Sequence, residues 1–171
     1  MEVTLRPLTR ADLALLGTWL REPLVAEWWH DDPNPAALER QYGPSIDGRD
    51  PTVLRMGEVD GVAAGFVQWY RWADEPDWAA ELAPFLRIPD DAWSLDYLVG
   101  EPTLRRRGIG TALVRAALER IGPAPVVVPV QAGNAGSIAL LRRAGFAVVA
   151  HADLEPDNPA HGRDHVVLAR A

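Results

Sequence analysis

Two hydrophobic periods alternate along the chain, and together they predict strands and helices in a mixed order. Alternating or wholly apolar runs are typical of strands, whereas apolar residues spaced three and four apart are typical of helices. The predicted strands cover residues 3–6, 52–59, 62–72, 92–99, 126–130, 146–150 and 165–169. The predicted helices cover residues 9–22, 35–42, 108–121 and 137–144.

Polar residues and glycines mark where several of these elements begin and end. Thr9 and Asp12 have the spacing of a capping box at the start of the first helix, and Glu22-Pro23 ends that helix. Asp60-Gly61 is a two-residue hairpin signal, and Gly145 stands where a C-terminal glycine cap belongs. Irregular structure is predicted at 23–34 and, with one helical turn, at 73–91.

The resulting order, β-α-α-β-β-β-α-β-α-β-β, predicts one mixed domain of the α/β (α+β) class that spans residues 1–171. A chain of this length that is 48% hydrophobic and 24% charged can bury a sizeable core. No repeat, low-complexity segment or linker interrupts it.

The composition excludes several classes of function. No run is long and apolar enough to span a bilayer, and the first residues lack a signal-peptide pattern, so we expect a cytoplasmic protein without a membrane partner. A net charge of −7 argues against nucleic-acid binding; it suits a cationic ligand, although solubility alone also explains it. Because Cys and Lys are absent and the four His residues show no ligand spacing, we predict no thiol chemistry, Schiff base or metal.

A glycine-rich basic segment between a predicted strand and a predicted helix carries the strongest chemical signal. Its glycines let the backbone approach an anion, and the first amides of the helix point at that anion. The segment has neither the Gly-Lys-Ser/Thr of a Walker loop nor the third glycine of a dinucleotide fingerprint. Its residues are Arg105, Arg106, Arg107, Gly108, Ile109, Gly110 and Thr111.

This segment resembles the pyrophosphate loop of the GNAT superfamily of acyl-CoA N-acyltransferases, Gln/Arg-x-x-Gly-x-Gly/Ala. Residues 134–146, from Asn134 to Phe146, resemble the second core motif of that superfamily. The resemblance implies a GNAT fold, with a central mixed sheet of six to seven strands flanked by about four helices. In that fold the parallel fourth and fifth strands splay apart to hold CoA, and acetyl-CoA is the cosubstrate.

A narrower resemblance concerns the acceptor. Trp28-Trp29, the segment Gln41–Ser45 and the segment Leu95–Pro102 resemble the aminoglycoside 6′-N-acetyltransferases, which confer antibiotic resistance. The family transfers acetyl directly to an amine within a ternary complex. Two alternatives stay open: an acyltransferase for another amine, such as a siderophore precursor, and a non-catalytic module that binds acyl-CoA.

The resemblance also implies roles for individual residues. Asp96 corresponds to the catalytic carboxylate, and an Asp inside a strand, where Asp is depleted, needs a partner or a function. The backbone of Leu98 and Val99 would pair with the pantetheine arm. Asn134 would contact CoA, or would simply cap its helix. Together with the basic segment, these residues form the predicted cofactor site.

Aromatic and acidic residues suggest where a cationic acceptor binds. Trp28 and Trp29 lie next to acidic residues, as do Asp77 and Trp78 in the segment 73–91, and ring faces with carboxylates suit ammonium groups. With Asp96 they form the predicted substrate site. A Trp pair in the core and solvated acidic loops would give the same pattern.

Two positions depart from the family pattern. The Tyr general acid of the family falls at Leu141, and the acidic acceptor contact of some members falls at Pro129. Either the thiolate leaves without an acid, or Tyr97 or a water molecule protonates it. The oligomeric state, monomer or homodimer, is left open by the sequence.

Overall fold

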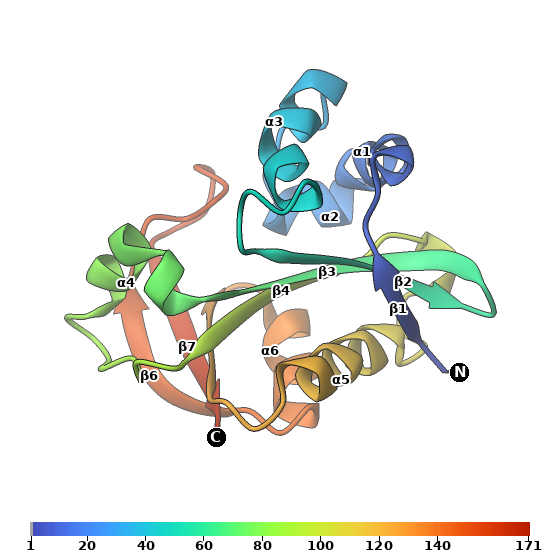
Figure 1. The fold of residues 1–171 in the computed structure, drawn as a ribbon. Helices are drawn as coiled ribbons and strands as arrows, with labels where there is room; N and C mark the ends of the chain where they lie inside the picture. Colours follow the sequence, from blue (N-terminus) through green and yellow to red (C-terminus); the bar gives the residue numbers. More distant parts are fainter. Residues whose placement is uncertain (1) are drawn as a thin grey trace.

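The computed structural model describes residues 2–171, which form one seven-stranded sheet with helices on both faces (Figure 1). The strands are β1 (Thr4–Pro7), β2 (Val53–Val59), β3 (Val62–Arg71), β4 (Trp93–Val99), β5 (Val126–Gln131), β6 (Ala147–Asp153) and β7 (Asp164–Arg170). The helices are α1 (Leu13–Leu20), α2 (Pro23–Trp28), α3 (Pro35–Ile46), α4 (Pro76–Leu82), α5 (Ile109–Ile121) and α6 (Ala135–Arg143), with short 3-10 turns at 10–12, 72–74 and 102–104.

The sheet has the order β1-β2-β3-β4-β5-β7-β6. Every neighbouring pair is antiparallel except β4 and β5, which run parallel and pair at Trp93 and Val126, near the start of both strands. The mixed α/β sheet and its parallel central pair, which the resemblance implied, are therefore confirmed. Farther along, residues of both strands line a common cavity, so the strands separate toward their carboxyl ends.

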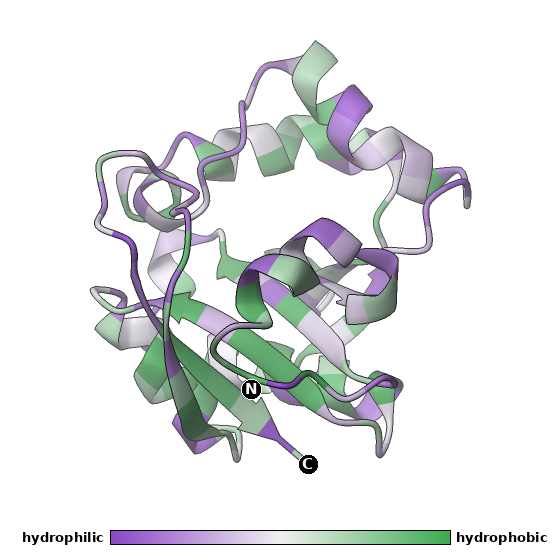
Figure 2. Cartoon of the chain, turned by 90° about the vertical axis from the view of Figure 1, so that its left-hand side faces the viewer, coloured by the Kyte–Doolittle hydropathy of each residue, from purple (hydrophilic) through white to green (hydrophobic). Residues whose placement is uncertain are grey.

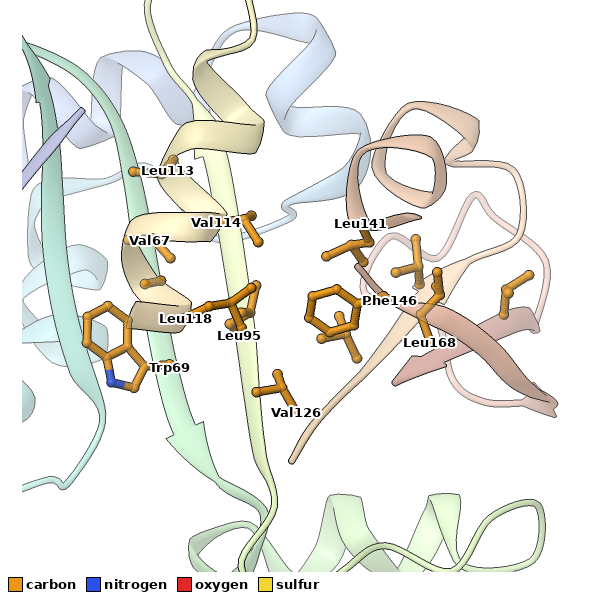
Figure 3. Close-up of a cluster of buried hydrophobic side chains, with 14 residues drawn as sticks. Val67, Trp69, Leu95, Leu113, Val114, Leu118, Val126, Leu141, Phe146 and Leu168 are labelled. Atoms are coloured by element: carbon orange, nitrogen blue, oxygen red, sulfur yellow. The ribbon is translucent and has the colours of Figure 1, made fainter. Parts of the chain in front are cut away.

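Each face of the sheet has its own core. Helices α1–α3 cover one face, where Leu16, Leu38 and Phe66 belong to one buried cluster. Helices α5 and α6 cover the other face, where Leu113 and Leu141 pack with residues of β3, β4, β5 and β7 (Figure 3). In Figure 2, hydrophobic residues concentrate in the strands, whereas many hydrophilic ones lie in loops and on the helices. The sheet therefore separates two layers, and a residue's position on a strand determines the layer in which its side chain packs.

Residues 2–171 contain six α-helices, two more than the four expected. The additional helices are α2 and α4, which lie in the two segments predicted as largely irregular. Both begin with a proline, Pro23 and Pro76, at their first position, where the missing N–H has no helical acceptor in any case. Pro23 thus ends one helix and starts the next. Helix α3 also runs to Ile46, beyond the expected end, although Pro44 lies inside it.

The predicted turn chemistry is confirmed. Asp60 and Gly61 both have positive φ, 51° and 75°, as a two-residue hairpin with the right twist requires. The Asp12 carboxylate accepts bonds from the backbone and hydroxyl of Thr9, which completes the capping box. Gly145 ends α6 with φ of +96°. In the described part of the chain, no helix combines the length and the apolarity needed to cross a membrane.

Candidate active site

A cavity of about 510 Å³ opens where β4 and β5 separate. Its walls come from both layers of the fold and from segments far apart in the sequence. They include the end of α2 and the residues after it, α3, the segment that carries α4, strands β3 to β5, the first turn of α6 and the loop between β6 and β7. The cavity contains most of the predicted acceptor residues and the predicted catalytic carboxylate.

Asp96 lies on the cavity wall, on the α1–α3 face of β4. It stands opposite Gln68 in the β3–β4 register, and the Gln68 amide donates a hydrogen bond of 2.9 Å to its Oδ2. Burial raises the pKa of Asp96 to about 6, against the lowering effect of this bond, and the charges of Asp157, Asp31 and Glu75 raise it further. Asp96 is therefore mostly ionised at neutral pH, and its pKa lies close enough to neutral pH for the carboxylate to exchange a proton with a ligand.

Seven more residues with carboxylates line the cavity, and three of them, from three different segments, raise the pKa of Asp96: Asp31 after α2, Glu75 before α4, and Asp157 between β6 and β7. Asp31 is held in place, because its Oδ2 accepts bonds of 3.0 Å from Trp29 Nε1 and 2.6 Å from the Tyr42 hydroxyl. Like charges brought together in this way strongly favour a cationic ligand over a neutral one.

Aromatic rings line the same cavity. The Trp28 ring lies 4.5 Å from that of His161, and the Trp29 ring 5.5 Å from that of Phe66, so both predicted tryptophans are fixed by neighbours and still face the cavity. Trp78 stacks on Trp72 at 5.9 Å between ring centroids and also lines the cavity. Fixed rings of this kind provide flat surfaces for a sugar or an ammonium group.

The structure does not bring every predicted acceptor residue to the cavity. Asp77 is exposed on α4 and is not among the lining residues, whereas Glu75 and Glu81 of the same segment are. A role of Asp77 in acceptor binding stays a prediction.

The loop between β6 and β7 is a cavity wall that the sequence did not reveal. The Asn158 amide donates a bond of 3.2 Å to the carbonyl of Glu27, and His161 packs on Trp28. These contacts hold the loop at the cavity, where burial and the charge of Asp31 raise the pKa of Asp157. In the sequence, Asp157 stands in a polar, proline-containing stretch without periodicity, so its acidic character was the only signal available.

The basic segment has the conformation that an anion-binding loop needs. Gly108 caps α5 with φ of +83°, and Arg106 also has positive φ, 60°. The first helical bond in α5 runs from Ala112 to the Gly108 carbonyl, so the amides at 109–111 have no acceptor within the helix. Because these amides and the helix dipole point outward together, the N-terminus of α5 suits a pyrophosphate.

The three arginines of this segment differ in their contacts. Arg105 donates to the carbonyls of Val99 at 3.2 Å and Gly100 at 3.1 Å, so its side chain ties the loop to the end of β4. Arg106 and Arg107 are exposed beside the loop, where their charges add to the attraction for phosphates. Gly110 is buried, and a Cβ there would lie 2.6 Å from a Leu140 methyl, so glycine permits the packing of α5 on α6.

Asn134 and Leu98 of the predicted cofactor site differ in which of their groups a ligand can reach. Asn134 caps α6 by accepting a bond of 3.0 Å from the Ser137 amide, and it also lines the cavity, so the structure accommodates both predicted roles. Leu98 is buried with its side chain in the α1–α3 cluster, which leaves only its backbone for a ligand. Leu141 is fully buried in the core on the α5–α6 face (Figure 3). Among residues 2–171 no group of three or more His, Asp or Glu side chains forms a candidate metal site.

Comparison with known proteins identifies the family. Residues 9–154 match the acetyltransferase (GNAT) domain family. The aminoglycoside N(6′)-acetyltransferases type 1 of Klebsiella pneumoniae and of Serratia marcescens are each 31% identical to the chain over 153 residues, which cover 84% of this chain and 73% of the relative.

Solved structures agree with this match. The aminoglycoside acetyltransferase AAC(6′)-Ib in complex with coenzyme A superposes with a TM-score of 0.83 at 26% identity, over 99% of this chain and 95% of that one. The AAC(6′)-Ib complex with ribostamycin and coenzyme A gives a TM-score of 0.84 at 26% identity, over 100% and 94%. The sheet order, the separated β4 and β5, and these matches together show that the chain belongs to the acetyltransferase (GNAT) family and is an acyltransferase.

Proposed function

We propose that the protein transfers the acetyl group of acetyl-CoA to an amine of a cationic small molecule, and that this molecule is an aminoglycoside acetylated at its 6′-amine. The observation that carries the proposal is the position of Asp96, with its raised pKa, inside a cavity that seven other carboxylates and four tryptophans also line. Such a cavity suits a polyamine sugar, because ammonium groups pair with carboxylates while sugar rings lie on aromatic faces. The relatives named for this activity support the same acceptor.

The donor side of the proposal uses the other end of the β4–β5 gap. The amides from Arg107 to Thr111 would hold the pyrophosphate of acetyl-CoA, and the exposed Arg106 and Arg107 would add charge. The backbone of Leu98 and Val99 would pair with the pantetheine arm, which brings the thioester to Asp96. Because acetyl-CoA is available in the cytoplasm, we place the reaction and any resistance that it confers in that compartment.

The reaction needs a neutral amine, and the carboxylates supply it. Asp96 accepts a proton from the bound ammonium group, directly or through water, and the freed amine attacks the thioester carbonyl. A C–N bond forms, the C–S bond breaks, and the CoA thiolate leaves. Most of the acceleration comes from holding both substrates in line, which the fixed positions of Asp31 and the tryptophans favour.

The acceptor is tested by measuring free-thiol release from acetyl-CoA with a panel of amines. The panel holds aminoglycosides with and without a 6′-amine, hydroxylysine and polyamines. Turnover confined to the 6′-amino compounds is expected. Turnover with hydroxylysine or polyamines alone would show that the acceptor is not an aminoglycoside. Tight CoA binding without any turnover would favour the non-catalytic alternative.

The raised pKa of Asp96 predicts an acidic limb in the pH profile. Since the ionised carboxylate is the active form, kcat/KM should rise with pH through about 6. The Gln68 bond lowers the pKa of Asp96, so Gln68→Met should move this limb to higher pH and reduce activity more at pH 6 than at pH 8. Profiles of kcat/KM for the two proteins between pH 5 and 9 test this. An acidic limb at the same pH in both proteins would show that a group other than Asp96 causes it.

Removing one acceptor carboxylate at a time should weaken acceptor binding without affecting the donor. Asp31→Asn and Asp157→Asn are each expected to raise the acceptor KM about tenfold, the size of one lost charge-assisted hydrogen bond, with the KM of acetyl-CoA within about twofold of the original. Asp60→Asn, at a turn residue with positive φ that Asn tolerates, is the matched control. An unchanged acceptor KM in both variants would place the acceptor elsewhere.

A further inference from the structure

Two neighbouring residues of β4 reach the cavity from opposite faces of the strand. Asp96 points to the α1–α3 face, where it bonds Gln68, and Tyr97 points to the α5–α6 face. Both line the cavity, because β5 has moved away from β4 at this level. An acyl group held in the gap would therefore have a carboxylate on one side and a phenol on the other.

The Tyr97 hydroxyl is held by the first turn of α6. It lies 2.7 Å from Ser137 Oγ, and it also donates toward the Ser137 carbonyl at 3.4 Å. Ser137 itself lines the cavity, and Asn134 fixes its amide by capping the helix. The phenol is thus positioned from two elements, one on each side of the gap.

The other phenols that line the cavity are placed differently. The Tyr42 hydroxyl donates to Asp31, on the acceptor side. Tyr70 stands opposite Ser94 in the β3–β4 register and so shares the face of Asp96. Leu141, on α6, is fully buried and carries no exchangeable proton. Among the tyrosines of this chain, Tyr97 alone lies on the side of β4 opposite the carboxylates.

We propose that Tyr97 is the catalytic acid, whose hydroxyl donates a proton to the CoA sulfur as the C–S bond breaks, with Ser137 as its positioning partner. The inference rests on the proposed acetyl transfer. In the balanced step, the amine loses one proton to Asp96, the electron pair of the C–S bond goes to sulfur, and sulfur takes the Tyr97 proton. The tyrosinate is then reprotonated from solvent through the Ser137 hydroxyl, while Asp96 releases its proton to solvent.

The electrostatics of the pair support this division of roles. Burial raises the pKa of Tyr97 to about 12, and the nearby charge of Asp96 contributes, so the phenol keeps its proton at neutral pH. Asp96, with a pKa of about 6, has lost its own. Two titratable groups on adjacent residues, held in opposite protonation states, fit a base on one side of the acyl group and an acid on the other.

The test combines kinetics with a titration of bound CoA. Tyr97→Phe should lower kcat about 10- to 100-fold, within the usual range for a lost general acid, while both KM values stay within about twofold. The thiol pKa of CoA bound to the enzyme, followed by the ultraviolet absorbance of the thiolate, should rise in this variant, because the phenol no longer donates to the thiolate. Tyr70→Phe, on the other face, should leave that thiol pKa unchanged.

Ser137→Ala keeps the phenol and removes its partner, so it should lower kcat about threefold and shift the thiol pKa in the same direction. An unchanged kcat and thiol pKa in a folded Tyr97→Phe variant would overturn the proposal, as would a loss confined to KM; should that variant not fold, unchanged values in Ser137→Ala would overturn it. The thiol titration needs CoA alone, so it decides the role of Tyr97 even if the wild-type protein acetylates no aminoglycoside.

Discussion

Asp96→Asn should reduce turnover about 10²- to 10⁴-fold and leave CoA affinity unchanged, because the amide keeps the shape of the side chain but accepts no proton. The carboxylate lies on the acceptor face, away from the loop that would hold pyrophosphate. A steady-state assay of thiol release, together with calorimetric titration of CoA, separates the two effects.

Measuring thermal stability distinguishes the loss of the Asp96 carboxylate from damage to the fold. The pKa of Asp96 is raised in the folded state, so ionisation of Asp96 lowers stability progressively as the pH rises from near 4 to about 6. At pH 7 the Asn variant should therefore unfold at the same temperature or a higher one. Asp60→Asn, the matched control, should leave turnover and melting unchanged. An Asp96→Asn protein that keeps its turnover, or that loses it together with its stability, would contradict a catalytic role for Asp96.

Gly108→Ala should weaken CoA binding about tenfold, the largest effect that we expect on the donor side. Nothing lies within 4 Å of the position that a Cβ would occupy at Gly108, so an added methyl group meets no protein atom, and we expect it to obstruct a ligand at the N-terminus of α5. Since φ is +83°, alanine also strains the loop by about 1 kcal/mol. Titration of CoA into the purified variant measures the loss.

Gly48 provides a matched control for the strain. Its φ is +71°, and a Cβ there also meets nothing within 4 Å, but it lies at the end of α3 and not at the N-terminus of α5. Gly48→Ala should therefore destabilise the protein to a similar extent without affecting CoA affinity. Equal CoA affinity in the two variants would show that the backbone of the loop does not hold the cofactor.

The features predicted well from the sequence are those set by local chemistry. The Asp60-Gly61 hairpin, the Thr9 capping box and the Gly145 cap after α6 each depend on a few adjacent residues, and the structure has all three. Asp96 could be predicted because a carboxylate inside a strand is unusual and because the residues around it resemble a family motif. Helices α2 and α4, of six and seven residues, are too short to show a helical period, and Pro23 indicates the end of the preceding helix more readily than the start of a new one.

Contacts between residues far apart in the sequence could not be predicted. The contact that brings the β6–β7 loop to the cavity joins Asn158 to Glu27, which are 131 positions apart, and no local pattern encodes it. The same applies to the bonds that Tyr42 and Trp29 make to Asp31, which turn an ordinary acidic residue into a fixed part of the wall. The face of β4 that each residue occupies was predictable from alternation, but the gap that exposes Asp96 and Tyr97 to one cavity was not.

The most direct test of the central claim compares kcat/KM for two aminoglycosides that differ only in a 6′-amine or a 6′-hydroxyl, with acetyl-CoA as donor. We expect measurable thiol release with the amine, no release above background with the hydroxyl, and a product whose added acetyl group is on the 6′-nitrogen. Equal rates with the two compounds, or an acetyl group found at another amine, would contradict the proposed 6′ specificity of this cavity.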